Sequence, residues 1–204
     1  MSTTVKRILI GIGAFVLLFA GYVSYQFMTT KNHSPEKKIA FTSGDWEVSV
    51  FYNRPYKKER VIFGELVPYG EVWRTGANEA TTFTTNQDLL VEGQPLKAGT
   101  YTLWTIPQQD AWTVIFNEKS YDWGVKMEDF KPVASREADG DVLQVIVPVT
   151  ALTESLEQFT ITLEGESSPT MVLAWDQTQI EVAIAKEGAE EPQMAVMPQN
   201  IDLL

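Results

Sequence analysis

Cysteine is absent from this chain of 204 residues, and histidine occurs once, at His33. Without cysteine there can be no disulfide, no thiolate nucleophile, no iron–sulfur cluster and no lipoprotein anchor. A lone histidine outside the predicted domain supports neither a zinc site nor a Ser-His-Asp triad. Phosphate-binding loops and the nucleophile and zinc-protease motifs are also missing. We therefore expect no metal and no cofactor. Whether the protein is an enzyme is left open, and we favour a protein that is not one.

Positive charge is scarce after Ile39. From Ala40 onward, 11 basic residues stand against 26 acidic residues, which gives a formal charge of −15 at neutral pH. A surface this acidic repels the phosphates of nucleic acids. We therefore expect no nucleic-acid partner. The sequence indicates no particular oligomeric state.

Charge of either sign is missing from residues 8–27. Twenty helical residues reach about 30 Å, which matches the hydrocarbon core of a bilayer. Because Lys6 and Arg7 directly precede this run, we predict a membrane signal-anchor over residues 1–28, with its N-terminus in the cytoplasm. A polar tether over residues 29–39 follows it. The alternative is a cleaved signal peptide, and both place the domain outside the cytoplasm.

Residues 40–186 are predicted to form one β domain. Apolar and polar side chains alternate there in short runs, for example from Trp46 to Tyr52, and glycine- and aspartate-containing turns separate the runs. Period-two patterns of this density predict strands. We predict an all-β fold, an antiparallel β-sandwich with a jelly-roll-like order as one possibility and a closed barrel as the alternative. Residues 187–204 have the composition of a disordered tail.

The candidate site lies in residues 52–85, where arginines, aromatic residues and glycines interrupt the strand pattern. Arg74 and Glu79 are predicted to flank a hairpin whose tight turn spans residues 75–78. One interpretation is structural, with Arg74 and Glu79 paired across the hairpin and Asn78 capping the turn. The other is functional, with the same three side chains forming the polar floor of a ligand pocket.

Three further residues complete the predicted site. Trp73 and Tyr69 would form its walls, because aromatic faces stack on sugar rings; core packing is the alternative. Arg54 follows a strand and could bind a carboxylate or sugar hydroxyls, or pair with a nearby glutamate. The neighbouring run Tyr56-Lys57-Lys58 is interpreted as solvated surface.

Three segments resemble one bacterial family. They read IFGELVPYGEVWRTGANEATTF at residues 62–83, LKAGTYTLWTIP at 96–107 and WTVIFN at 112–117. Over residues 41–184 the chain is similar to the family called "domain of unknown function 2911". The resemblance implies a mostly β domain and no particular activity. Together with the predicted anchor, it places a single-pass protein in the bacterial cell envelope.

Three hypotheses for the function follow. The first is a membrane-anchored module outside the cytoplasm that binds a glycan, a cell-wall fragment or a peptide through Arg54, Tyr69, Trp73, Arg74, Asn78 and Glu79. The second is a hydrolase, since two carboxylates can cleave a glycosidic bond; its pair would be Glu79 with Glu65, Glu71 or Asp122. The third is a purely structural module of the envelope. The first hypothesis is our expectation.

Overall fold

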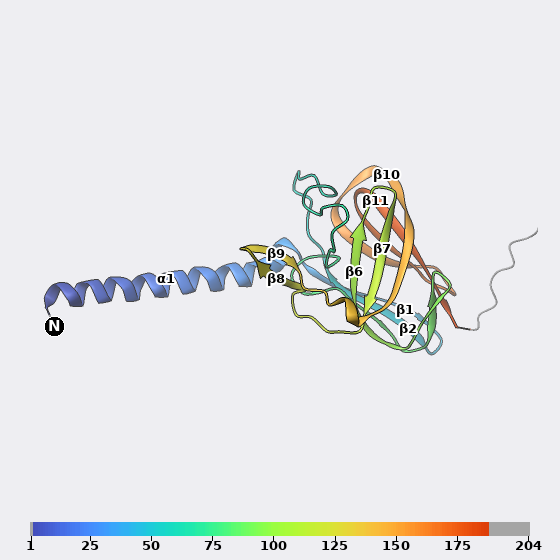
Figure 1. Ribbon diagram of the computed structural model, residues 1–204, viewed down its shortest axis with the longest axis horizontal. Helices are drawn as coiled ribbons and strands as arrows, with labels where there is room; N and C mark the ends of the chain where they lie inside the picture. Colours follow the sequence, from blue (N-terminus) through green and yellow to red (C-terminus); the bar gives the residue numbers. More distant parts are fainter. Residues whose placement is uncertain (1, 188–204) are drawn as a thin grey trace, which may run out of the picture.

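A long N-terminal helix leads into a β domain in the computed structural model, which describes residues 2–187 (Figure 1). Helix α1 spans Thr3–His33, and the Ser2 hydroxyl caps it by accepting a hydrogen bond from the Val5 amide at 3.3 Å. By length and composition it is the one helix in the described residues that could cross a membrane, and a signal sequence would meet the same criteria. The predicted apolar helix is therefore confirmed.

The segment predicted as a tether has regular structure over most of its length. Residues 29–33 complete α1, and strand β1 begins at Glu36, after Ser34 and Pro35. The Arg54 amide donates to the carbonyl of Pro35 at 2.9 Å, which fastens this short link to the domain. Only two residues therefore separate the helix from the sheet, and β1 pairs with β2 along its whole length. Of the predicted tail, residues 188–204 lie outside the described residues.

The strands are short except for two. Their bounds are β1 Glu36–Ser43, β2 Trp46–Asn53, β3 Thr82–Thr85, β4 Leu89–Val91, β5 Gln94–Leu96, β6 Gly99–Pro107, β7 Ala111–Asn117, β8 Val125–Glu128, β9 Lys131–Ala134, β10 Asp141–Glu164 and β11 Thr170–Lys186. A 3-10 turn, Ala138–Gly140, precedes β10.

The strands form an antiparallel sandwich. In the described residues, nine strands are hydrogen-bonded in the order β1-β2-β3-β6-β7-β10-β11-β4-β5, and β8 and β9 form a separate hairpin. The first part of β10 pairs with β7, and the rest pairs with β11. Its register with β11 shifts between Ala151 and Leu156 and again between Leu156 and Thr160. The order ends in two free edges, so the sheet is not a closed barrel and the predicted sandwich is confirmed.

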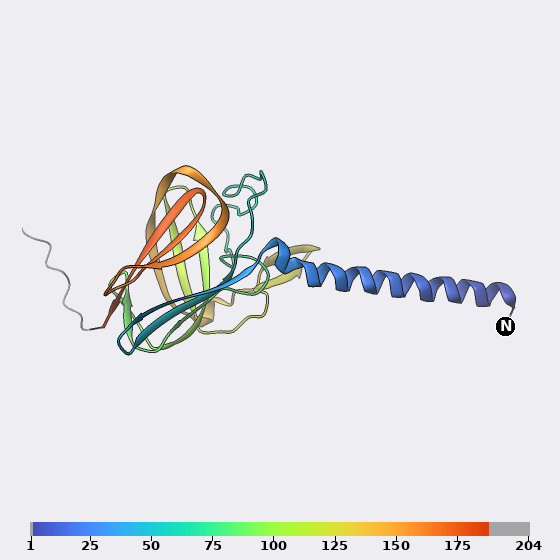
Figure 2. The same cartoon turned by 180° about the vertical axis from the view of Figure 1, so that it is seen from behind.

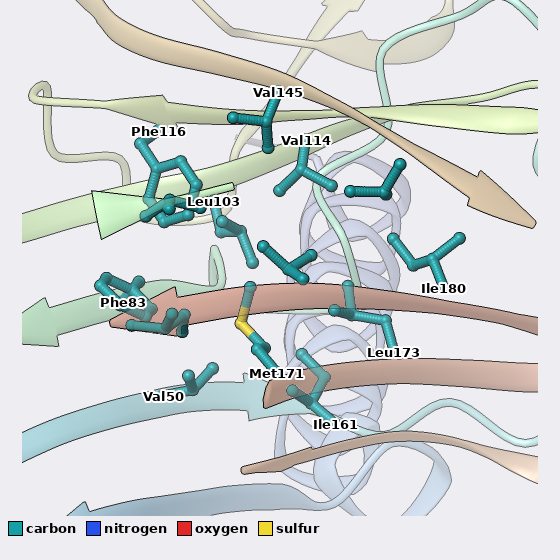
Figure 3. Packing of buried hydrophobic residues seen from close by; sticks show 14 of the residues in the cluster. Val50, Phe83, Leu103, Val114, Phe116, Val145, Ile161, Met171, Leu173 and Ile180 are labelled. Atoms are coloured by element: carbon teal, nitrogen blue, oxygen red, sulfur yellow. The ribbon is translucent and has the colours of Figure 1, made fainter. Parts of the chain in front are cut away.

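Alternating side chains from both layers meet in the core. Figure 3 shows Val50, Phe83 and Leu103 in one cluster with residues of β10 and β11, namely Ile161, Met171, Leu173 and Ile180. Tyr52 links the layers, since its hydroxyl donates to the Ile161 carbonyl at 3.0 Å and accepts from the Ile161 amide at 2.9 Å. The alternation read from the sequence therefore marks the core face of the strands.

The predicted hairpin around residues 75–78 is wrong. Trp73 makes only an isolated bridge with Thr105, and the next strand begins at Thr82. The intervening chain is an irregular loop, called here the motif loop and defined as residues 73–81. Positive φ values at Thr75, Gly76 and Asn78 turn it away from a strand path.

Candidate functional site

A pocket of about 820 Å³ opens where α1 meets the domain. Five parts of the chain that are distant in the sequence contribute to its wall: the end of α1 at His33 and Ser34, several residues between 55 and 60, several between 66 and 77, the β8–β9 hairpin, and Trp175 of β11. A cavity of this size is typical of sites for small organic ligands. The end of α1 is therefore part of the wall of this pocket.

Aromatic rings form the floor of the pocket. Trp73 and Trp175 both line it, and their rings stack with centroids 6.0 Å apart and planes at 18°. Trp73 also meets Phe159 edge-on at 5.0 Å, and its indole N–H donates to the Gly76 carbonyl at 3.2 Å. Trp73 thus packs against the core and also lines the pocket, so both of the alternatives considered for it, pocket wall and core packing, apply.

Three cationic side chains line the pocket without a carboxylate partner. They are Lys58, Arg60 and Arg74, and no ion pair found within residues 2–187 includes any of them. Glu71 is the one carboxylate among the lining residues. The pocket is therefore positive in a domain that is otherwise strongly acidic. A positive, partly apolar cavity favours a ligand with an anionic group.

Arg74 clamps two of the pocket's segments. Its Nη1 donates to the carbonyl of Asn78 at 3.1 Å and to the carbonyl of Trp123, at the base of the β8–β9 hairpin, at 2.9 Å. Both bonds use the same nitrogen, so Nε and Nη2 have no partner among the described residues. Burial lowers the pKa of Arg74, and the charge of Glu79 offsets this only in part. The guanidinium still keeps its proton at physiological pH, so its charge is available to a ligand.

The motif loop is held in a strained conformation. Thr75 is fully buried with φ 56°, a left-handed conformation that a β-branched residue rarely adopts. The Thr81 hydroxyl donates to the Thr75 carbonyl at 2.7 Å, and the hydroxyls of Thr75 and Thr105 lie 3.1 Å apart. At Gly76, with φ 149°, a Cβ would come within 3.0 Å of the Asn53 carbonyl. Strain of this kind is typical of segments whose shape is set by a site.

Asn78 and Glu79 face the helix and not the pocket. The Asn78 amide donates to the Ser34 carbonyl at 3.2 Å, just beyond the end of α1. Glu79 lies 3.3 Å from the Lys31 ammonium and accepts from the Asn53 amide at 3.0 Å. These contacts fasten α1 to the domain. The ion pair between Arg74 and Glu79 that the structural interpretation required is absent from the described residues, because each side chain has other partners.

The environment of Glu79 suits a stable carboxylate. Partial burial alone would raise its pKa, but hydrogen bonds from its own amide, Lys31 and Asn53, together with the charge of Lys31, outweigh burial and lower the pKa. A general acid in a glycosidase needs the opposite shift. Of the carboxylates considered as its partner, Glu71 lines the pocket, whereas Glu65 and Asp122 do not.

Arg54 and Tyr69 lie outside the pocket wall. Arg54 Nε donates to the Phe159 carbonyl at 3.3 Å and Nη2 to the Thr160 hydroxyl at 3.0 Å, so this side chain joins β2 to β10. Tyr69 is 38% exposed, and its ring fills the space beside Gly64. Of the six residues predicted for the site, the structure brings Trp73 and Arg74 into the pocket.

Sequence reasoning missed Lys58, Arg60 and Trp175. Lys58 was interpreted as solvated surface, and its Nζ indeed contacts only His33 Nδ1, at 3.3 Å, among the described residues. One signal was available: residues 54–60 hold four of the 11 basic residues of the acidic domain. No comparable signal marks Trp175, which reaches the pocket through the pairing of β11 with β10.

The described residues contain no group of three or more histidine, cysteine or carboxylate side chains placed to hold a metal ion. A family model described as "Protein of unknown function (DUF2911)" matches residues 34–184. No curated protein and no solved structure gave a match. The match begins at Ser34, directly after the last residue of α1.

Proposed function

The chain belongs to the DUF2911 family, and we propose that it is a membrane-anchored binding module whose domain lies outside the cytoplasm in the bacterial cell envelope. The pocket beside α1 would bind a small ligand that combines a carboxylate with an apolar part. A peptide with a free C-terminus and a cell-wall fragment both carry this chemistry.

The positive pocket is the observation that supports this proposal most directly. Lys58, Arg60 and Arg74 line a cavity of about 820 Å³ and have no carboxylate partner in the described part of the chain. The partly buried guanidinium of Arg74 has no counter-ion, which costs free energy, and an anionic ligand would offset that cost. Trp73 and Trp175 add an apolar floor on which the rest of the ligand could pack.

The anchored topology is supported by the sequence of α1. Residues 8–27 carry no charge, and Lys6 and Arg7 precede them. Basic residues next to an apolar run favour the cytoplasmic side for the N-terminus. The domain, which follows the helix, would then lie on the other side of the membrane.

The proposal can be tested by thermal unfolding of the full chain in lipid nanodiscs. The probes are a tripeptide with a free C-terminal carboxylate, the same tripeptide amidated, a muropeptide and a neutral chito-oligosaccharide. A ligand at a hundredfold its Kd adds about 2.7 kcal/mol to the unfolding free energy. For a chain of this length that raises Tm by about 5–10 °C.

Variants connect a hit to the pocket. We expect Lys58→Gln to weaken binding of a carboxylate probe by about tenfold, since a charge-assisted hydrogen bond is worth about 1.5–3 kcal/mol. Lys97→Gln is the matched control, because Lys97 is exposed and pairs with Asp88 away from the pocket. Four probes without effect, or equal shifts with the carboxylate and its amide, would rule out the proposed ligand class.

A further inference from the structure

The β8–β9 hairpin ends in an exposed apolar tip. Phe130 is 98% exposed and Met127 is 66% exposed. β8 and β9 are joined by Asp129 and Phe130 alone, and both have positive φ, at 49° and 62°. This pattern is that of a two-residue type I′ turn, which favours asparagine and glycine.

Phenylalanine is a poor choice for this turn. Its Cβ is disfavoured in the left-handed region, and a fully exposed ring gains no packing energy inside the protein. A single exposed apolar residue needs no explanation. An exposed aromatic ring held in a conformation that disfavours it does point to a function outside the folded domain.

The hairpin projects toward the side of the molecule from which α1 emerges. Both views show β8 and β9 extending beyond the rest of the domain to the level of the last turns of α1 (Figures 1 and 2). The turn between β1 and β2 lies at the opposite end. Residues of the hairpin and His33 line the same pocket, so the hairpin base and the helix end are neighbours.

The length of α1 sets the distance from the domain to the membrane. The charge-free run ends at Phe27, and six residues remain to His33. At about 1.5 Å per residue, the helix ends only about 9 Å beyond the hydrocarbon boundary. The headgroup layer occupies about 5–8 Å of that distance. A segment that extends back along the helix must therefore enter the headgroup layer.

We propose that the β8–β9 hairpin inserts its tip, Met127 and Phe130, into the interfacial layer of the bilayer beside α1. This inference rests on the membrane anchor of the proposed function. The hairpin carries Lys126 and Lys131 against Glu128 and Asp129, so its formal charge is zero. Headgroups do not repel it as they repel the acidic domain. One aromatic ring could not hold a free protein on a membrane, but α1 keeps this one at the surface.

Insertion would fix the position of the pocket. Val125, Pro132, Val133 and Ala134 form its wall on the hairpin side. With the tip in the bilayer and α1 in its core, the domain has two points of contact with the membrane. The pocket, which lies between them, would open at the membrane surface.

The absence of cysteine allows single spin labels on the full chain in lipid nanodiscs. Labels are placed at Met127→Cys for the tip, at Leu17→Cys for the anchor and at Asp45→Cys for the far end of the domain. Power saturation compares the access of oxygen, which concentrates in lipid, with that of a water-soluble nickel chelate. We expect the labels at 127 and 17 to favour oxygen and the label at 45 to favour nickel.

A second substitution shows whether Phe130 drives insertion. Phe130→Asn removes the ring and suits the turn, so the hairpin remains folded. In the Met127→Cys background we expect it to raise nickel access at least twofold. A label at 127 as exposed as the one at 45, with the label at 17 in lipid, overturns the hairpin proposal alone. A label at 17 in water overturns the anchor and the hairpin proposal together.

Discussion

The ring of Trp73 packs edge-on against Phe159 and stacks on Trp175, and it also lines the pocket. Its neighbour Arg74 shares the pocket, whereas Asn78 and Glu79 hold the end of α1. Adjacent residues of one motif thus have different tasks. Loss of function after substitution of Asn78 or Glu79 would reflect the attachment of the helix, and only substitutions of pocket residues would report on a ligand.

Replacing Trp73 tests its contribution to the core. We expect Trp73→Ala to lower the free energy of unfolding by about 3 kcal/mol, because it removes a large ring from an aromatic cluster. Trp73→Phe keeps a ring and should cost about 1 kcal/mol, mainly through the lost hydrogen bond to Gly76. Chemical denaturation followed by tryptophan fluorescence measures both. An alanine variant as stable as the parent would show that the ring belongs to the pocket alone.

At the scale of elements, β10 and the β8–β9 hairpin differ in how firmly they are held. β10 pairs with β7 and with β11, and its inward side chains lie in the core. The hairpin pairs only with itself in the described residues, and its tip lies in solvent when no membrane is present. Two strands alone are marginally stable in water. The hairpin therefore depends on its base, where Arg74 binds the Trp123 carbonyl.

The positive φ of Phe130 strains the turn of the β8–β9 hairpin, so a substitution at this position can change the hairpin's stability. Phe130→Asn should stabilise it by about 1 kcal/mol, because asparagine tolerates the left-handed conformation that phenylalanine resists. Slower amide hydrogen exchange in residues 125–134 is the expected observation. Asp129→Asn is the control at the other turn position, which already holds a residue tolerant of positive φ. Unchanged exchange in both variants would mean that the turn stores no strain.

At the scale of the whole molecule, acidic residues with cationic partners determine the response to pH. Burial alone would raise the pKa of Asp141, but hydrogen bonds from Arg136 and Asn117 and the charge of Arg136 lower it below its usual value. Asp176 is lowered in the same way, with burial opposed by Lys57 and Ser155. A lowered pKa in the folded state stabilises the protein above the unfolded value of about 4.

Tm is therefore expected to be flat from neutral pH to about pH 5 and to fall below about pH 4, as protons bind these carboxylates more tightly in the unfolded state. Asp141→Asn should cost about 3 kcal/mol at pH 7, because it leaves the mostly buried Arg136 uncompensated. It should also make the decline at low pH shallower. Thermal unfolding between pH 3 and 8 measures both effects, and an equally steep decline in the variant would contradict this assignment.

The alternation of residues such as 46–52 was enough to predict an antiparallel sandwich, because one buried face imposes a period of two on a strand. The charge-free run was enough to predict α1. The tether was harder to interpret. Lys37 and Lys38 look like linker residues, yet β1 forms because β2 offers its backbone hydrogen bonds along the whole strand.

The candidate site was predictable only in part. Residues 73–81 stood out by composition, and Trp73 and Arg74 do line the pocket. Their partners could not be inferred. Arg74 binds backbone carbonyls of Asn78 and Trp123, and a carbonyl acceptor leaves no trace in residue identity.

The sequence alone determined the helix, the β class and the acidic surface, since each depends on local composition or on a period along the chain. The tertiary structure decided which cations share a cavity and which way the Phe130 hairpin projects. It joined Lys58, Arg74 and Trp175 from segments up to 117 positions apart in the chain. Such groupings depend on the order in which strands pair, and local patterns do not carry that order.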